Sequence, residues 1–101
     1  MYRQGDVLLI PVAELPKRLR AVGRQGGRLV LALGEATGHA HAVADPAAEL
    51  LEDDGGRYLE VGGDGATLSH EEHAPIRLPA GAYRVVLQRE YAPGENRNVA
   101  D

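Results

Sequence analysis

The chain has 101 residues and a formal net charge of −4, from 11 basic and 15 acidic residues. Because it has no cysteine, disulfides, thiolate zinc sites, iron–sulfur clusters and thiol nucleophiles are excluded. No apolar run approaches the roughly 20 residues of a membrane span, and the first residues lack a signal-peptide pattern, so we expect a cytoplasmic protein. The acidic balance argues against nonspecific binding of nucleic acid.

The spacing of turn-forming residues indicates the fold class. Thirteen glycines and six prolines separate short stretches rich in Val, Leu, Ile and Tyr. This rhythm predicts one all-β domain over residues 1–101. We expect an antiparallel barrel or a jelly-roll-like sandwich of about six to eight short strands.

The first half of the chain contains three predicted strands. The segment 6–12 is continuously apolar after Asp6, which predicts a strand buried on both faces. Residues 17–28 are basic and predict an exposed loop, and residues 28–33 predict a second strand. In residues 38–44 the alternation of side chains places His39, His41 and Val43 on one face of a third strand.

Residues 45–61 are compatible with two structures. Asp45 and Pro46 form a helix-start signature, but residues 50–52 and 58–61 flank a turn at 53–56. We favour a β-hairpin over a helix here. Beyond it we expect a short strand at 66–69, an extended piece at 75–78, a long strand at 82–91 and a polar tail at 92–101.

The histidines form the main chemical signal, because all four fall into two close pairs. His39 and His41 share one face of a strand, and His70 and His73 come within reach of each other in a turn, which we expect at residues 69–73. Imidazole nitrogens bind divalent metals, so the sequence predicts one metal site from these four residues. Zinc is our first expectation, with iron or manganese as alternatives, and Glu71 or Glu72 is a further ligand or a partner of the ligands.

The histidine pairs are also compatible with roles that need no metal. Each pair can be part of a solvated strand or loop, and four adjacent imidazoles can act as a pH switch. If a metal site is present and catalytic, the ion activates water or oxygen, with Glu72 as general base and Arg89 and Tyr91 as ligand contacts. If the site is structural, four imidazoles saturate the ion. We favour a structural or accessory binding module.

Two features outside the histidine pairs bear on partners. The segment 17–28 carries five positive charges and no acid, which allows phosphate or nucleic-acid binding, but it has no aromatic residue to stack on a base. Strand edges left unpaired in a small antiparallel domain predict a homo-oligomer, and a protein partner is an alternative.

The sequence His39-Ala40-His41 is similar to the first metal motif of cupins, jelly-roll proteins that bind iron, manganese, zinc or nickel. Here the next acids, Asp45 and Glu49, lie farther on than the cupin glutamate, so no catalytic role is carried over from this resemblance, and a cupin-like hydrolase or oxygenase stays an alternative.

A broader resemblance covers most of the chain. The motifs GEATGHAH at residues 34–41 and HEEHAPI at residues 70–76 resemble those of small uncharacterised bacterial and phage-associated proteins. This resemblance implies a stand-alone module and no particular activity.

Overall fold

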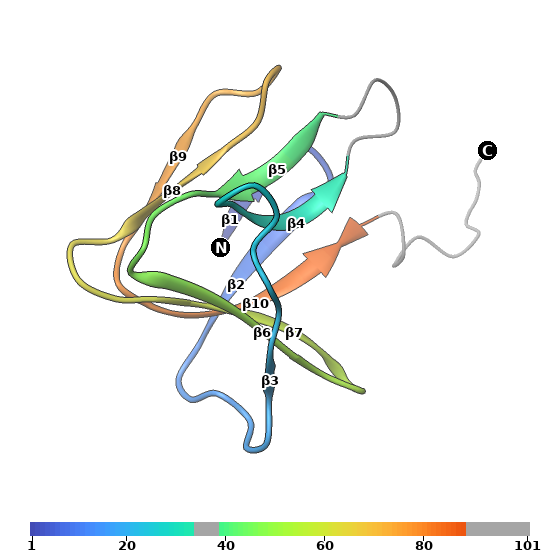
Figure 1. Ribbon diagram of the computed structural model, residues 1–101, viewed down its shortest axis with the longest axis vertical. Coiled ribbons are helices and arrows are strands. Elements are labelled where there is room, and N and C mark those ends of the chain that lie inside the picture. Colours follow the sequence, from blue (N-terminus) through green and yellow to red (C-terminus); the bar gives the residue numbers. More distant parts are fainter. Residues whose placement is uncertain (34–38, 89–101) are drawn as a thin grey trace.

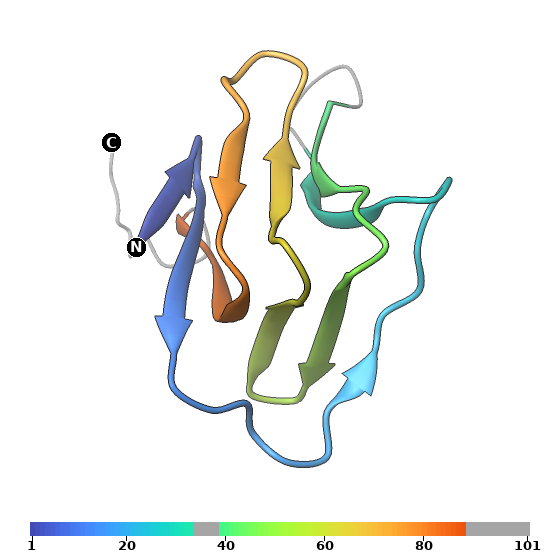
Figure 2. The same cartoon turned by 90° about the vertical axis from the view of Figure 1, so that its left-hand side faces the viewer.

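A computed structural model of the chain describes residues 1–33 and 39–88 and shows two antiparallel sheets (Figure 1). The larger sheet has the strand order β1-β2-β10-β7-β6-β3, and the smaller has the order β4-β5-β8-β9. Figure 2 shows the same strands from the side. The ten strands of the described residues are β1 Tyr2–Gln4, β2 Val7–Val12, β3 Arg20–Ala21, β4 Leu29–Leu33, β5 Ala40–Val43, β6 Ala48–Asp53, β7 Gly56–Val61, β8 Ala66–Ser69, β9 Ile76–Leu78 and β10 Gly81–Leu87.

The predicted all-β class is confirmed, in its sandwich form. The two sheets are separate and do not close into a barrel, so the barrel alternative is wrong. Two of the short strands, β1 and β3, were not predicted, which explains why the count exceeds six to eight. Among the described residues, no helix is long and apolar enough to cross a membrane.

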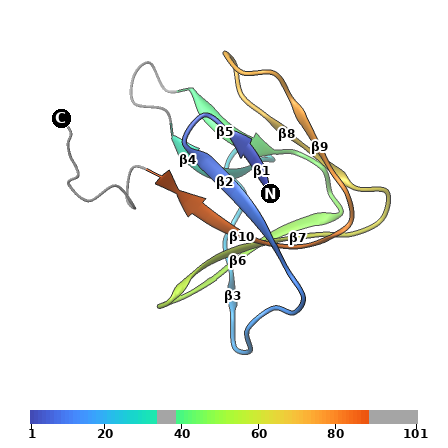
Figure 3. The same cartoon turned by 180° about the vertical axis from the view of Figure 1, so that it is seen from behind.

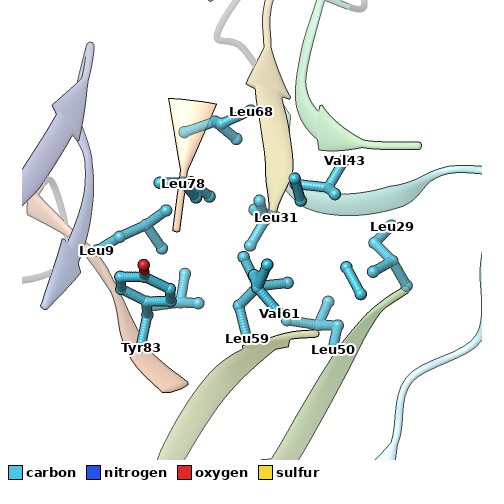
Figure 4. Close-up of a cluster of buried hydrophobic side chains, with 13 residues drawn as sticks. Leu9, Leu29, Leu31, Val43, Leu50, Leu59, Val61, Leu68, Leu78 and Tyr83 are labelled. Carbon is cyan, nitrogen blue, oxygen red and sulfur yellow. The ribbon is translucent and has the colours of Figure 1, made fainter. Parts of the chain in front are cut away.

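The core lies between the two sheets and is built mainly from aliphatic side chains, with Tyr83 as its aromatic member, because the chain has neither Phe nor Trp. Figure 4 shows these side chains converging from both sheets. Full burial of one Leu or Val side chain stabilises the fold by roughly 1.5–3 kcal/mol. The largest fully buried residues are Leu9, Leu31, Leu50, Leu59, Leu68, Leu78, Val7 and Val43.

Strand β2 is buried on one face only, which corrects the expectation for residues 6–12. Val7 and Leu9 are completely buried, whereas Ile10 is 36% exposed. Alternate residues of a strand point to opposite faces, and only one face of the larger sheet packs into the core cluster. The continuous apolar sequence therefore predicted more burial of this strand than the structure shows.

The hairpin predicted within residues 45–61 is confirmed, and the helix alternative is wrong. Strands β6 and β7 pair from Ala48 opposite Val61 to Asp53 opposite Gly56. The Asp53 carboxylate accepts hydrogen bonds from the backbone N–H groups of Gly55 and Gly56, at 2.8 and 3.0 Å. An Asp side chain that bonds the backbone two residues on favours a turn over a continuing helix.

The basic segment 17–28 is mostly loop, as predicted, but two parts of it form β structure. Strand β3 adds to β6 through Arg20 opposite Glu52. Gln25 and Arg28 then form a bridge around Gly26 and Gly27, whose φ angles of +60° and +81° are those that a two-residue type I′ turn requires.

The last strand confirms the predicted alternation as far as the structure describes it. In β10, Tyr83 and Val85 face the core while Arg84 is exposed. Arg89 and Tyr91, and the tail 92–101, lie outside the described residues.

Candidate metal centre

The four histidines lie at one end of the sandwich, where three segments meet: the β1–β2 turn, the start of β5 and the β8–β9 loop. Figure 3, seen from behind, shows β1 and β2 in front of β5 and β8. A Cβ atom built on Gly5, in the β1–β2 turn, would lie 3.0 Å from His73 Nε2 and 3.2 Å from His41 Cε1. The turn backbone therefore packs directly against two imidazole rings.

The β1–β2 turn consists of two residues, Gly5 and Asp6, since Gln4 pairs with Val7. Gly5 has a φ of +59°, the sign that a type II′ hairpin turn requires of its first central residue. Position 5 therefore favours glycine for two reasons: the backbone has a positive φ, and a side chain would be too close to the imidazole rings.

Alternation along β5 places the side chain of His41, which is 3% exposed, on the same face as the core residue Val43. His39 lies just before the strand, and its side chain is 28% exposed. The pairing of Ala42 with Ser69 brings β5 beside β8, and the Ser69 hydroxyl donates a hydrogen bond to the Ala42 carbonyl at 3.2 Å. Because Ser69 lies opposite Ala42, the next residue along the chain, His70, lies close to His39 and His41.

The two histidine pairs meet within one chain. Residues 71–73 form the expected bend, and the His70 ring lies at the centre of the group. Its centroid is 4.3 Å from that of His41, 4.7 Å from that of His73 and 5.7 Å from that of His39. The four rings form one contiguous cluster.

A buried glutamine holds the innermost ring. Gln4 is 3% exposed, and its amide nitrogen donates hydrogen bonds to the Leu68 and Ala74 carbonyls at 3.1 and 3.0 Å. These two bonds orient the amide, so its Oε1 faces His41 Nδ1 at 2.9 Å as an acceptor. His41 therefore carries a proton on Nδ1, and its Nε2 lies 3.8 Å from an Asp6 carboxylate oxygen.

On the outer side of the cluster, three potential metal ligands converge. His39, His70 and Glu71 each offer one ligand atom, and these atoms lie within 4.8 Å of one another. The Glu71 carboxylate accepts a hydrogen bond from the Ala40 N–H at 3.0 Å, and this bond is the main reason why the pKa of Glu71 is below its ordinary value of 4.5. Glu71 is thus a carboxylate over a wide pH range, as a metal ligand must be.

Glu72 contacts the rings of both histidines of the three-ligand group, His39 and His70. Its carboxylate lies 3.5 Å from His39 Nδ1, and its backbone N–H donates to His70 Nδ1 at 3.0 Å. A carboxylate beside the second nitrogen of a histidine is a common way of orienting a metal ligand. The neutral His70 ring, which accepts at Nδ1, carries its proton on Nε2.

All four predicted histidines are therefore in the cluster, together with Glu71 and Glu72, whereas Arg89 and Tyr91 fall outside the described residues. Gln4, Gly5 and Asp6 were not predicted from the sequence. The Gly5-Asp6 pair is a turn signal that would have predicted the β1–β2 hairpin. Nothing in the sequence indicates that Gln4 reaches His41.

Two arginines of the basic segment form hydrogen bonds or ion pairs with other residues of the chain. Arg24 donates to the carbonyls of Gly27, Ala44, Asp45 and Ala48, and Arg20 lies 3.8 and 3.9 Å from carboxylates of Glu52 and Asp54. These arginines hold the segment to neighbouring loops and strands.

Comparison with known proteins identifies a family without a known function. No curated protein and no solved structure matches the sequence significantly. A family model described as a domain of unknown function, DUF8820, matches residues 3–88, which include every described residue of the histidine cluster. This agrees with the resemblance to uncharacterised proteins. The chain belongs to the DUF8820 family.

Proposed function

We propose that this domain binds one divalent metal ion through His39, His70 and Glu71. The observation that carries the proposal is the approach of their three ligand atoms to within 4.8 Å of one another. Metal–nitrogen and metal–oxygen bonds of about 2.0–2.2 Å place neighbouring ligand atoms roughly 3–3.5 Å apart. Side-chain adjustments of roughly an ångström therefore close the site around an ion.

The ligand types agree with zinc as the first expectation and with iron(II) or manganese as alternatives. Two imidazoles and one carboxylate are the protein ligands of several catalytic zinc sites and of non-haem iron(II) sites. Such sets leave coordination positions open for water or another ligand. A metal-bound water with a pKa lowered to about 7 would supply a nucleophile at neutral pH, so the enzyme alternative retains a chemical basis.

A second candidate is a closed site of four imidazoles, which would make the ion structural. It is favoured by the contiguous packing of the His39, His41, His70 and His73 rings. Structural ions contribute their binding energy to folding, so their removal unfolds or strongly destabilises small domains. Self-association through the sheet edges remains a separate prediction.

Elemental mass spectrometry on untagged protein, loaded with Zn²⁺ and dialysed, tests the proposal. The wild type should keep about one ion per chain, and a His39→Ala/Glu71→Gln double variant should keep almost none. His73→Ala is the matched control, because His73 lies in the cluster but outside the three-ligand group. Retention by His73→Ala supports the three-ligand site. Loss of the ion in His73→Ala as well supports the four-imidazole site.

A further inference from the structure

A pocket of about 250 Å³ opens beside the three-ligand group. It is lined by Arg28, Ala40, Ser69, His70 and Glu71, so it shares two residues with the proposed metal site. Ala40 and Ser69 are small, and the Ser69 hydroxyl already donates its proton to the Ala42 carbonyl. Among the described residues that line this space, the charged ones are Arg28 and Glu71.

Arg28 is held in place through its backbone. Its N–H donates to the Gln25 carbonyl at 3.1 Å and its carbonyl accepts from the Gln25 N–H at 2.7 Å, which closes the tight turn before β4. The backbone from which the Arg28 side chain extends is therefore fixed at the edge of the smaller sheet.

The guanidinium of Arg28 differs from those of Arg20 and Arg24. Arg20 faces two carboxylates, and Arg24 donates to four carbonyls. Within residues 1–33 and 39–88, no hydrogen bond or ion pair joins the Arg28 side chain to another residue. Its five N–H donors can therefore serve a ligand on the pocket side.

The charges of the pocket indicate what would bind there. The charges of Arg28 and Glu71 cancel each other, and a divalent ion on His39, His70 and Glu71 would bring the net charge of these described groups to about +2. Arg28 lines the same space as His70 and Glu71, two of the three proposed ligands. Carboxylates and phosphates have two or more oxygens, which suits them to bridge a metal and an arginine fork.

We infer that the metal-loaded domain binds a small oxyanion, a carboxylate or a phosphate, between the ion and Arg28. This inference rests on the proposed metal site and adds the chemical class of its ligand. Because the ion supplies most of the positive charge, anion and metal binding are coupled, and each increases the affinity for the other.

The test uses Co²⁺-loaded protein, whose visible spectrum reports changes in the coordination of the ion. Titration with inorganic phosphate and, separately, with acetate should change the spectrum in a saturable manner. Arg28→Gln should weaken the binding of the preferred anion at least about tenfold. Arg20→Gln, which removes an exposed arginine of the same segment, should bind the anion like the wild type.

Two controls separate the possible failures. Co²⁺ should bind Arg28→Gln and wild type within about threefold, and both should melt at similar temperatures, because Arg28 is neither a ligand nor a core residue. If Co²⁺ binds but neither anion does, or if Arg28→Gln binds the anion as well as the wild type, the oxyanion inference is wrong and the metal site stands. If Co²⁺ does not bind to the wild type, the proposed metal site and the oxyanion inference are both wrong. The anion whose titration saturates at the lower concentration, phosphate or acetate, identifies the preferred class of ligand.

Discussion

Gln4 Oε1 accepts a hydrogen bond from His41 Nδ1 at 2.9 Å, and both side chains are buried at the end of the sandwich. The same amide donates to carbonyls of β8 and of the β8–β9 loop. One side chain of β1 thus connects the larger sheet to the smaller sheet and to the histidine cluster. The position of His41 depends on this connection.

Replacement of Gln4 by Leu should lower the free energy of unfolding by about 2–4 kcal/mol, because the His41 N–H, the buried Leu68 carbonyl and the partly buried Ala74 carbonyl lose their partner. Urea unfolding would measure the change. Gln25→Leu is the control, since Gln25 is exposed and pairs only through its backbone, and it should change stability by less than about 0.5 kcal/mol. Equal stability of the two variants would contradict the role given to Gln4.

Gly5 should tolerate no side chain. Gly5→Ala introduces strain at a φ of +59° and places a methyl group 3.0 Å from His73 Nε2, so a loss of about 2 kcal/mol or more is expected. Gly26→Ala is a matched control, because Gly26 has a φ of +60° but nothing within 4 Å of the added carbon. The difference between the two unfolding free energies measures the contact with the imidazoles. No difference would show that the turn does not press on the cluster.

The Glu71 carboxyl should titrate with a pKa below 4.5 in the folded protein, chiefly because it accepts the Ala40 N–H. Since this pKa is lower in the folded than in the unfolded chain, Glu71 contributes stability above the unfolded value, and the contribution is lost as the pH falls through the folded value. NMR titration of the side-chain carboxyl carbon measures the midpoint. In Glu71→Gln, the corresponding part of the pH dependence of stability should disappear. A midpoint at or above 4.5 would contradict the lowered pKa of this carboxyl.

Metal binding should rearrange the 70–73 bend. His70 Nδ1 accepts the Glu72 N–H, which leaves the proton on Nε2 in the neutral ring. An ion can bind His70 at Nε2 only if that proton leaves, or at Nδ1 only if the Glu72 N–H moves away. Zinc should therefore shift the Glu72 amide resonance and the ¹⁵N resonances of the His70 ring, while the Glu60 amide in β7 should stay unchanged. An unmoved Glu72 amide in zinc-loaded protein would argue against His70 as a ligand.

The sequence predicted the parts of the fold that depend on local patterns. The hairpin of β6 and β7 follows from its turn residues, and the orientation of His41 and Val43 follows from simple alternation. Strand β1 was missed because it has three residues, one of them the buried but polar Gln4. Burial on both faces of β2 was wrong because apolarity alone does not show which face is covered.

The candidate site was predictable in its residue types and not in its arrangement. Clustering of all four histidines in the sequence indicated metal chemistry, but their meeting depends on the pairing of Ala42 with Ser69, which no local signal specifies. The contact of Gln4 with the Leu68 and Ala74 carbonyls spans 64 and 70 residues of chain. Long-range pairing of this kind depends on the packing of the whole sandwich.

X-ray absorption spectroscopy of the zinc-loaded protein at the zinc edge tests the proposed metal site most directly, because it reports the atoms bound to the ion in solution. We predict two imidazole nitrogens from His39 and His70 with oxygen ligands completing the shell, and the loss of this spectrum in the His39→Ala/Glu71→Gln variant. A shell of four imidazoles, or a spectrum of hydrated zinc in the wild type, would contradict this site.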